Sequence, residues 1–176
     1  KYDRKKLDIP KRKKIDYIEY NENCLFKFFL IVKYGLDKYF WEKMDDFKFI
    51  ENEKIKIIEE FRNNKDKLKE LKIKKSVIEK EVPYSISIEV FKYLCLYYDL
   101  SVVLTMKLIV MYINPKENTI PFKIEKVNNY YKLKKDFTEK EYLELEKYLH
   151  VNNIEKPFTA LSSYKLGELK NMILML

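Results

Sequence analysis

A cysteine at the start of an apolar segment and the only histidine of the chain are the residues whose types and spacing best suit chemistry. Cys24 precedes a run of apolar residues that recur at helical spacing. In the first turn of a helix, the dipole and the unpaired backbone amides lower the pKa of a thiol and stabilise an oxyanion. Cys24 is therefore the candidate nucleophile of a cysteine hydrolase; the alternative is a buried Cys24 that packs as a small apolar residue.

The sequence around Cys24 resembles the cysteine motif of the ovarian-tumour (OTU) deubiquitinases. That motif reads approximately Asp-Gly-Asp/Asn-Cys-Leu-Phe-Arg; Asn23 to Phe26 match it, and Lys27 is a conservative change. A weaker similarity covers Ser87 to Val103, where a helix followed by a strand is similar to the segment before the family's catalytic histidine. His150-Val151-Asn152 keeps the family's two-residue spacing from base to orienting residue, so the resemblance implies Cys24 as nucleophile, His150 as base and Asn152 as orienter. It also implies an OTU-like or papain-like fold, with ubiquitin as the partner if the protein is active.

The sequence also departs from the OTU pattern. Asn21 stands where the family has Asp, and Glu22 replaces the Gly that lets the oxyanion loop turn tightly. The segment most similar to the family's histidine motif, Asn129-Tyr130-Tyr131, contains no histidine, and His150 is expected directly after a helix rather than on a strand. These departures favour a degenerate scaffold that is not an enzyme over an active hydrolase.

Positive charge is concentrated at the N-terminal end. The 176-residue chain carries a formal net charge of +8, and residues 1–14 contain eight Lys or Arg against two Asp, which leaves about +2 for the rest. Such an arm suits contacts with phosphates, a nuclear-import signal or an acidic protein patch, or serves only as a solubilising tail. Its basic cluster at 11–14 has no interleaved aromatic residue that would stack on bases. The candidate residues for binding nucleic acid or a protein partner are Arg4, Lys5, Lys6, Lys11, Arg12, Lys13 and Lys14.

Composition excludes several classes of site. Two glycines are too few for a P-loop or a dinucleotide-binding fingerprint, and one His with two Cys cannot supply the four ligands of a structural zinc site. We therefore expect no cofactor and no metal, and interpret the acidic pairs Asp45-Asp46 and Glu59-Glu60 as solvated charges. Lys27, Lys33 and Lys107 interrupt the most apolar stretches, so none is long enough to span a membrane. Two cysteines in apolar surroundings favour reduced thiols, as in the cytosol or nucleus.

The elements that must position these residues predict an α+β fold. Helices are predicted over Asn21–Gly35, Asn52–Leu71 and Ser87–Asp99, and a capping box at Thr138–Glu141 opens another through Tyr148. Strands are predicted at Leu100–Met106, Leu108–Ile113, Ile120–Val127 and Tyr130–Leu133. We expect these helices to pack on a small, mainly antiparallel sheet. The chain divides into a flexible basic arm (1–16), an α+β domain (17–150) and a C-terminal connector with a helix (151–176).

The C-terminal segment from Lys156 to Lys170 resembles tails of uncharacterised proteins of nucleocytoplasmic large DNA viruses, and its helix resembles the first helix of SAP and Rho-N modules. The abundance of Lys, Ile, Asn and Tyr agrees with an AT-rich genome. The resemblance implies a viral protein of the virion or of the infected host cytoplasm, with the nucleus as an alternative.

The leading hypothesis from the sequence is a non-enzymatic viral interaction protein. It would bind nucleic acid, or a viral or host protein, through its basic arm and its C-terminal helix. An OTU-like cysteine protease that uses Cys24 and a structural subunit of a capsid or transcription assembly are the alternatives.

Overall fold

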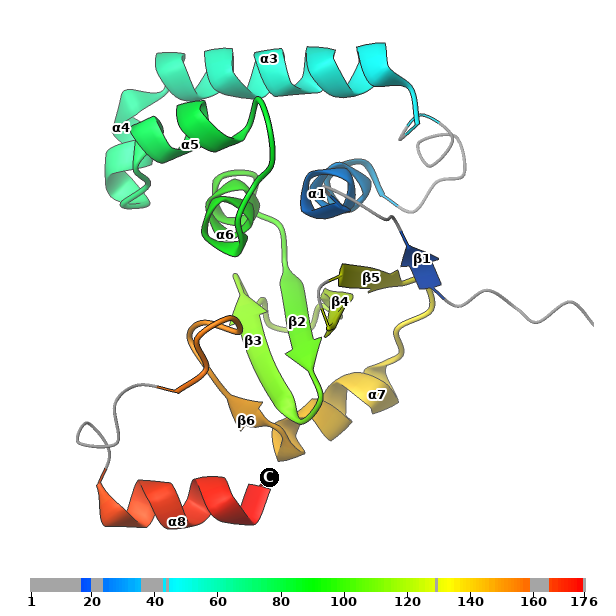
Figure 1. Cartoon of the computed structure of the whole chain (residues 1–176), viewed down its shortest axis with the longest axis vertical. Coiled ribbons are helices and arrows are strands. Elements are labelled where there is room, and N and C mark those ends of the chain that lie inside the picture. The colour runs from blue at the N-terminus through cyan, green and yellow to red at the C-terminus, as the bar shows by residue number, and fades with distance from the viewer. Residues whose placement is uncertain are drawn as a thin grey trace, which may run out of the picture.

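Figure 1 shows the computed structural model, which describes residues 17–19, 24–35, 43, 45–128, 130–158 and 165–175. The described strands form a single mixed sheet in the order β1-β5-β4-β2-β3-β6. Their bounds are Tyr17–Glu19 (β1), Val102–Met106 (β2), Ile109–Ile113 (β3), Phe122–Val127 (β4), Tyr130–Lys134 (β5) and Leu149–His150 (β6). Helices lie on both sides of this sheet, so the predicted α+β class is confirmed.

The sheet is antiparallel where neighbouring strands are joined by tight turns. The pairs β2–β3, β4–β5 and β1–β5 are antiparallel, whereas β2–β4 and β3–β6 are parallel. Because β3 returns to the end of the sheet where β2 began, the loop 114–121 leads β4 onto the free side of β2 in the same direction as β2. The backbone of Lys107 and Asn128 has positive φ in the two hairpin turns. The sheet is therefore mainly antiparallel, as predicted, with two parallel pairs.

The helices on one side of the sheet form two tiers. The inner helices, α1 (Cys24–Tyr34) and α6 (Ile88–Tyr97), pack on the sheet, and α3 (Phe47–Asn63), α4 (Lys65–Glu70) and α5 (Lys75–Glu81) lie outside them. The main core between these layers contains the completely buried Phe28, Phe29, Phe61 and Phe91. Ser87 caps α6, as predicted, since its hydroxyl accepts from the backbone N–H of Val90 at 3.3 Å.

The predicted helix from Asn52 to Leu71 is two helices in the structure. It begins earlier, at Phe47, because the Asp46 carboxylate accepts from the backbone N–H of Phe49 and caps the first turn. It breaks at Asn64, where the backbone leaves the helical region (φ −110°, ψ 52°); the backbone N–H and the side chain of Asn64 both donate to the backbone oxygen of Glu60 and close the end of the helix. Helix α5 was not predicted from the sequence at all.

A buried carboxylate ties the outer tier to the inner one. Glu53 of α3 is only 1% exposed, and it accepts hydrogen bonds from the Tyr34 hydroxyl of α1 at 2.5 Å and from Lys56 at 2.7 Å. Burial alone would raise the pKa of Glu53, but these bonds and the charge of Lys33 outweigh it and lower the pKa. Glu53 therefore stays ionised inside the helical layer.

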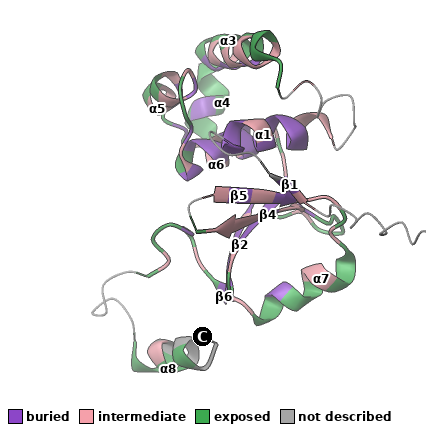
Figure 2. Ribbon diagram, turned by 45° about the vertical axis from the view of Figure 1, so that its right-hand side comes forward, coloured by how far each residue is buried: buried purple, intermediate pink, exposed green. Residues whose placement is uncertain are grey.

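The opposite side of the sheet is covered only in part. There α7 (Glu139–Glu144) and the 3-10 turn Leu145–Lys147 pack a small second cluster, Val103, Val110 and Leu145, against β2 and β3. Figure 2 shows the buried residues gathered on α1, α6 and the central strands, whereas α7 is largely exposed. The capping box of Thr138 and Glu141 is present, as predicted.

The chain beyond β6 first packs with the body and then leaves it. Ile154 is completely buried in the main core. Helix α8 (Leu166–Met175) follows, and Figures 1 and 2 both show it apart from the sheet and from the helical tiers. Within the described part of the chain, no helix combines the length and apolar character needed to cross a bilayer.

Candidate functional site

Cys24 is the first residue of α1, but it is not in an environment that activates a thiol. Its side chain is only 7% exposed and belongs to the main core. Burial raises the pKa of this thiol, and hydrogen bonds with the backbone of Tyr131, Cys24 and Leu25 oppose the rise without reversing it. The expected lowering of the pKa by the helix start is therefore outweighed by desolvation. Cys95 is likewise a buried free thiol with a raised pKa.

His150 lies on the other side of the sheet from Cys24. It is on strand β6 rather than directly after a helix, which corrects the expectation from the sequence, and it pairs with Val110. Its exposed ring lies 5.3 Å from the ring of Tyr112, on the face that carries the second cluster. Four strand spacings of about 4.8 Å, or roughly 19 Å, separate β6 from β5, against which α1 packs. Asn152 is exposed beyond β6, so the structure does not bring the three candidate catalytic residues together.

The structure instead places Cys24 beside the segment compared with the OTU histidine motif. The thiol contacts Tyr131 of β5, which follows Tyr130 in that motif. Asn129, the position where the family has its histidine, is outside the described residues and is an asparagine in the sequence. The described residues of this segment, Tyr130 and Tyr131, offer no imidazole to the thiol.

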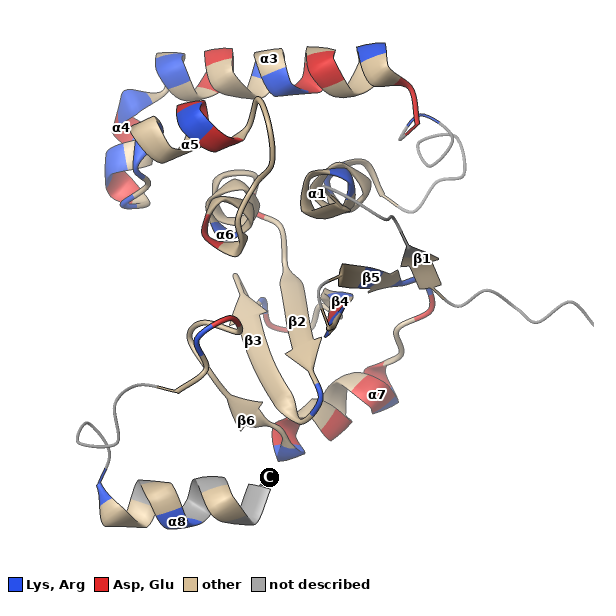
Figure 3. Cartoon of the chain, viewed as in Figure 1, with Lys and Arg blue, Asp and Glu red and all other residues tan. Residues whose placement is uncertain are grey.

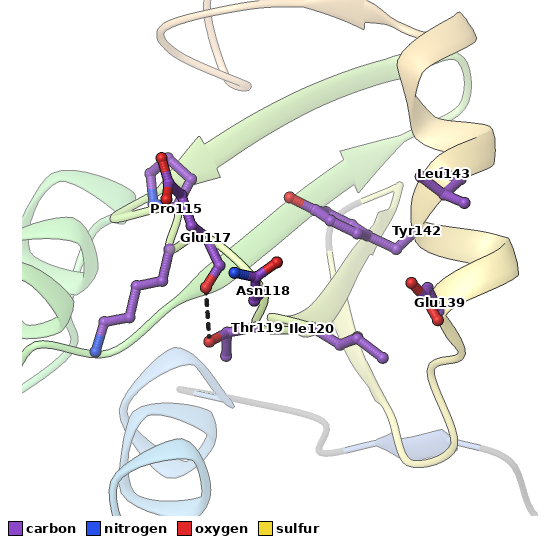
Figure 4. Close-up of a pocket in the computed structure, with 9 residues that line it drawn as sticks. Pro115, Glu117, Asn118, Thr119, Ile120, Glu139, Tyr142 and Leu143 are labelled. Atoms are coloured by element: carbon purple, nitrogen blue, oxygen red, sulfur yellow. Dashed lines mark hydrogen bonds between the residues drawn. The ribbon is translucent and has the colours of Figure 1, made fainter.

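A hollow of about 670 Å³ lies between the loop 115–120 and α7 (Figure 4). Tyr142 and Leu143 of α7 line one side, and Ile120 lies across from them. A smaller neighbouring hollow of about 320 Å³ continues past Tyr112 to His150. Neither hollow is lined by a cysteine, so His150 has no cysteine partner there.

Across strands β1, β5 and β4, the side of the sheet that faces away from α1 and α6 carries aromatic and basic side chains in place of an apolar core. Side chains alternate between the two faces of a strand, and Ile18, Tyr131, Leu133 and Ile124 point into the main core. Their neighbours along the strands therefore lie on the opposite side, which we call the open face. Its members are Tyr17, Lys123, Glu125, Tyr130, Lys132 and Lys134.

The centre of the open face is a lysine between two tyrosines. The ammonium of Lys132 lies 5.7 Å from the ring centre of Tyr17 and 5.4 Å from that of Tyr130. All three side chains are half-buried, so one part of each reaches the surface. The contacts are cation–π interactions that hold the two rings on either side of one charge.

Carboxylates balance part of the positive charge on this face. Lys134 forms an ion pair with Glu141 of α7. Lys123 lies 5.4 Å from the ring centre of Phe137, and burial lowers the pKa of its ammonium. Burial raises the pKa of Tyr17, and the neighbouring Glu125 adds to this effect, so the hydroxyl stays protonated near neutral pH. Because Glu125 and Glu141 offset part of the charge of the lysines, the open face is only slightly basic.

The basic arm predicted from the sequence lies outside the described residues, but its attachment point does not. The arm directly precedes Tyr17, the first residue of the edge strand β1, and Tyr17 is a member of the open face. Sequence reasoning missed the tyrosines and Lys132 of this face. The sequence signal that could have found them is the alternation in Tyr130-Tyr131-Lys132-Leu133-Lys134. Tyr131 and Leu133 face the core, so the other three residues lie on the opposite face of the strand.

The remaining candidate residues are placed as follows. Asp46 caps α3, Asp45 binds Lys27, and Glu60 accepts from the Tyr98 hydroxyl at 2.7 Å. In the described ranges, no group of three or more His, Cys, Asp or Glu is arranged to hold a metal ion. Leu166 and Ile173 of α8 are 70% and 74% exposed.

Comparisons of the chain with protein-family models, with curated proteins and with solved structures found no match in any of the three.

Proposed function

We propose that this protein is a non-enzymatic nucleic-acid-binding protein that uses the open face together with its basic N-terminal arm. The observation that carries the proposal is the Tyr17–Lys132–Tyr130 group at the point where the arm joins the sheet. Aromatic rings next to lysines suit a ligand that has both flat bases and phosphates. The buried Cys24 and the distant His150 support a binding role over hydrolysis.

The arm and the open face would contribute differently to binding. The arm has eight basic residues against two acidic ones in its first 14 positions, so it would supply most of the phosphate contacts. The open face has Lys132 near its centre, opposite Glu19 in the strand pairing, and Glu125 and Glu141 lie beside Lys123 and Lys134. We therefore expect affinity to depend mainly on the arm, and positioning of the ligand to depend on the sheet.

The test is fluorescence anisotropy with a labelled DNA or RNA oligonucleotide over a salt series. One variant replaces Lys11, Arg12, Lys13 and Lys14 with Gln; its matched control replaces Lys48, Lys65, Lys69 and Lys80, which are exposed on the outer helices. Losing phosphate contacts reduces the dependence of log K on log salt by about 0.9 for each contact, so the arm variant should bind roughly tenfold more weakly or worse and with a shallower slope. Equal affinities and slopes for the two variants would refute the role of the arm.

A protein partner is the second candidate function, and α8 is the observation that favours it. Its exposed Leu166 and Ile173 are seven residues apart, which places them on one side of a helix. Such a helix suits docking on a viral or host protein, or on another subunit of a capsid or transcription assembly. Replacing both residues with Glu should abolish co-purification of such a partner from infected cells and leave nucleic-acid binding unchanged. Retention of every co-purifying protein would exclude α8 as the contact.

A further inference from the structure

We infer that the open face takes single-stranded rather than duplex nucleic acid, with one base stacked on Tyr17 and one on Tyr130. The inference rests on the proposed function and specifies its ligand. Each ring belongs to a strand of the sheet, and both flank Lys132. In a duplex the flat faces of the bases are stacked on one another, so only an unpaired base presents its face to a side chain.

The strand pairing fixes the spacing of the two rings. Tyr17 of β1 lies opposite Lys134 of β5, and Lys132 lies opposite Glu19. Tyr130 is two residues before Lys132 on the same strand and therefore on the same face. The two tyrosines sit on opposite sides of Lys132, one on each of two hydrogen-bonded strands, which makes them parts of one rigid surface rather than of separate loops.

Exchange of the lysine for a base is energetically favourable. A cation–π contact at a partly exposed site contributes about 0.5–1 kcal/mol, whereas stacking of a base on an aromatic side chain contributes about 1–3 kcal/mol. A base that takes the place of the Lys132 ammonium over a ring would bring its phosphate close to this ammonium. The same three side chains would then supply two stacking platforms and one charge between them.

The charge around the open face limits the path of the strand. Figure 3 shows acidic residues along α7, which borders the face, and Glu141 of this helix pairs with Lys134. These carboxylates repel phosphates, so the strand would follow β1 and β5 rather than cross α7, with one end of its path at Tyr17. The other end of the path is at Tyr130, the first residue of β5.

The experiment compares single-stranded DNA, the duplex of the same sequence and a strand with abasic sites, each by fluorescence anisotropy over a salt series. A variant with Tyr17→Leu and Tyr130→Leu removes both rings and keeps the apolar bulk; its control, with Tyr17→Phe and Tyr130→Phe, keeps the rings and removes the hydroxyls. The Leu variant should bind the single strand roughly tenfold more weakly or worse at every salt concentration, because stacking contributes no counterion release. The Phe control should bind within about twofold of the unmodified protein.

The outcomes separate this inference from the proposed function. Equal losses of single-strand and duplex binding in the Leu variant, or no loss at all, would overturn stacking even if the arm variant still lowers the affinity for both. Loss of binding in the arm variant with no preference for the single strand would leave the proposed function and remove its single-stranded ligand. Circular dichroism and thermal unfolding check that both tyrosine variants remain folded, and Tyr17→Leu and Tyr130→Leu measured singly replace the double variant if it does not fold.

Discussion

The two sides of the sheet have different uses for the same strands. On the helical side every strand except β6 contributes a buried residue to one continuous core, which extends to Phe61 in the outer tier. On the other side the buried residues of the second cluster come from β2, β3 and the turn after α7, and strands β1 and β5 present Tyr17, Tyr130 and Lys132. The helical side therefore contributes most of the buried apolar surface that stabilises the fold, and the other side has exposed surface on which a ligand could bind.

The difference follows from what each side chain costs to bury. Apolar side chains contribute about 25 cal/mol for each Å² removed from water, so a face that carries Ile18, Leu133 and Ile124 is most stable under helices. Lysines on the alternate positions would lose hydration under a second layer, and the lowered pKa of Lys123 shows this cost where Phe137 partly covers it. A full cover over the open face would therefore be unfavourable.

The largest expected effect contrasts one leucine from each side. Leu94→Ala, in the main core, should lower the free energy of unfolding by about 4 kcal/mol. Leu145→Ala, in the second cluster, should lower it by about 2 kcal/mol, because a small cluster beside a short, exposed helix can relax around the lost side chain. Urea denaturation with both variants checks the order. Leu143→Ala, at a position 55% exposed, is the control and should stay within about 0.5 kcal/mol. An equal or larger loss for Leu145→Ala would show that the two sides are equally important to stability.

Most of the fold could be predicted because its signals are local. The hairpin of β2 and β3, the cap at Ser87 and the capping box at Thr138 are each encoded within a few residues. Strands β1 and β6 have only three and two residues, and they exist because distant strands supply their hydrogen bonds. No local pattern marks such pairing, and so β1 and β6 were missed.

The candidate site was harder to predict for the same reason. Tyr17 joins Lys132 only through the pairing of β1 with β5, which are more than a hundred residues apart in the sequence. Spacing along the chain likewise could not show that Cys24 and His150 lie on opposite sides of a sheet. The sequence indicates which residue types could take part in chemistry. The pairing of distant strands determines which of them lie close together.

The buried carboxylate of the helical side gives the next largest effect. Glu53→Ala removes the hydrogen bonds that Glu53 accepts from Tyr34 and Lys56 and should lower the free energy of unfolding by about 2 kcal/mol, since hydrogen bonds to a charged group contribute about 1.5–3 kcal/mol. Denaturation of Glu53→Ala, Tyr34→Phe and the double variant measures the coupling of the two groups. The exposed Glu59→Ala is the control. Additive single effects would show that Glu53 does not tie α3 to α1.

A smaller, pH-dependent effect belongs to the other side. A hydrogen bond from Lys134, and further bonds from Thr138, lower the pKa of Glu141 from 4.5 to about 2. Since the pKa is lower in the folded state, the stabilisation is complete above about pH 4.5 and is lost as the pH falls toward 2. Thr138→Ala should cost about 1 kcal/mol at neutral pH, and the difference from the unmodified protein should narrow across this range. Thermal unfolding between these pH values measures it, with Lys140→Ala of the same helix as control; a difference that is constant with pH would exclude Glu141 as the group responsible.

The smallest expected effect is an absence of reaction at Cys24, and it tests the assignment of this thiol to the core side of the comparison. Both thiols are buried and have raised pKa values, so each forms little thiolate at neutral pH. A ubiquitin-based electrophile and a small alkylating reagent should therefore leave the folded protein unmodified by mass spectrometry, whereas unfolding in urea should expose both thiols. A Cys95→Ala variant attributes any modification to Cys24. Rapid stoichiometric labelling of Cys24 in the folded protein would contradict its burial. Because His150 lies across the sheet, such labelling would require a base other than the histidine of this chain.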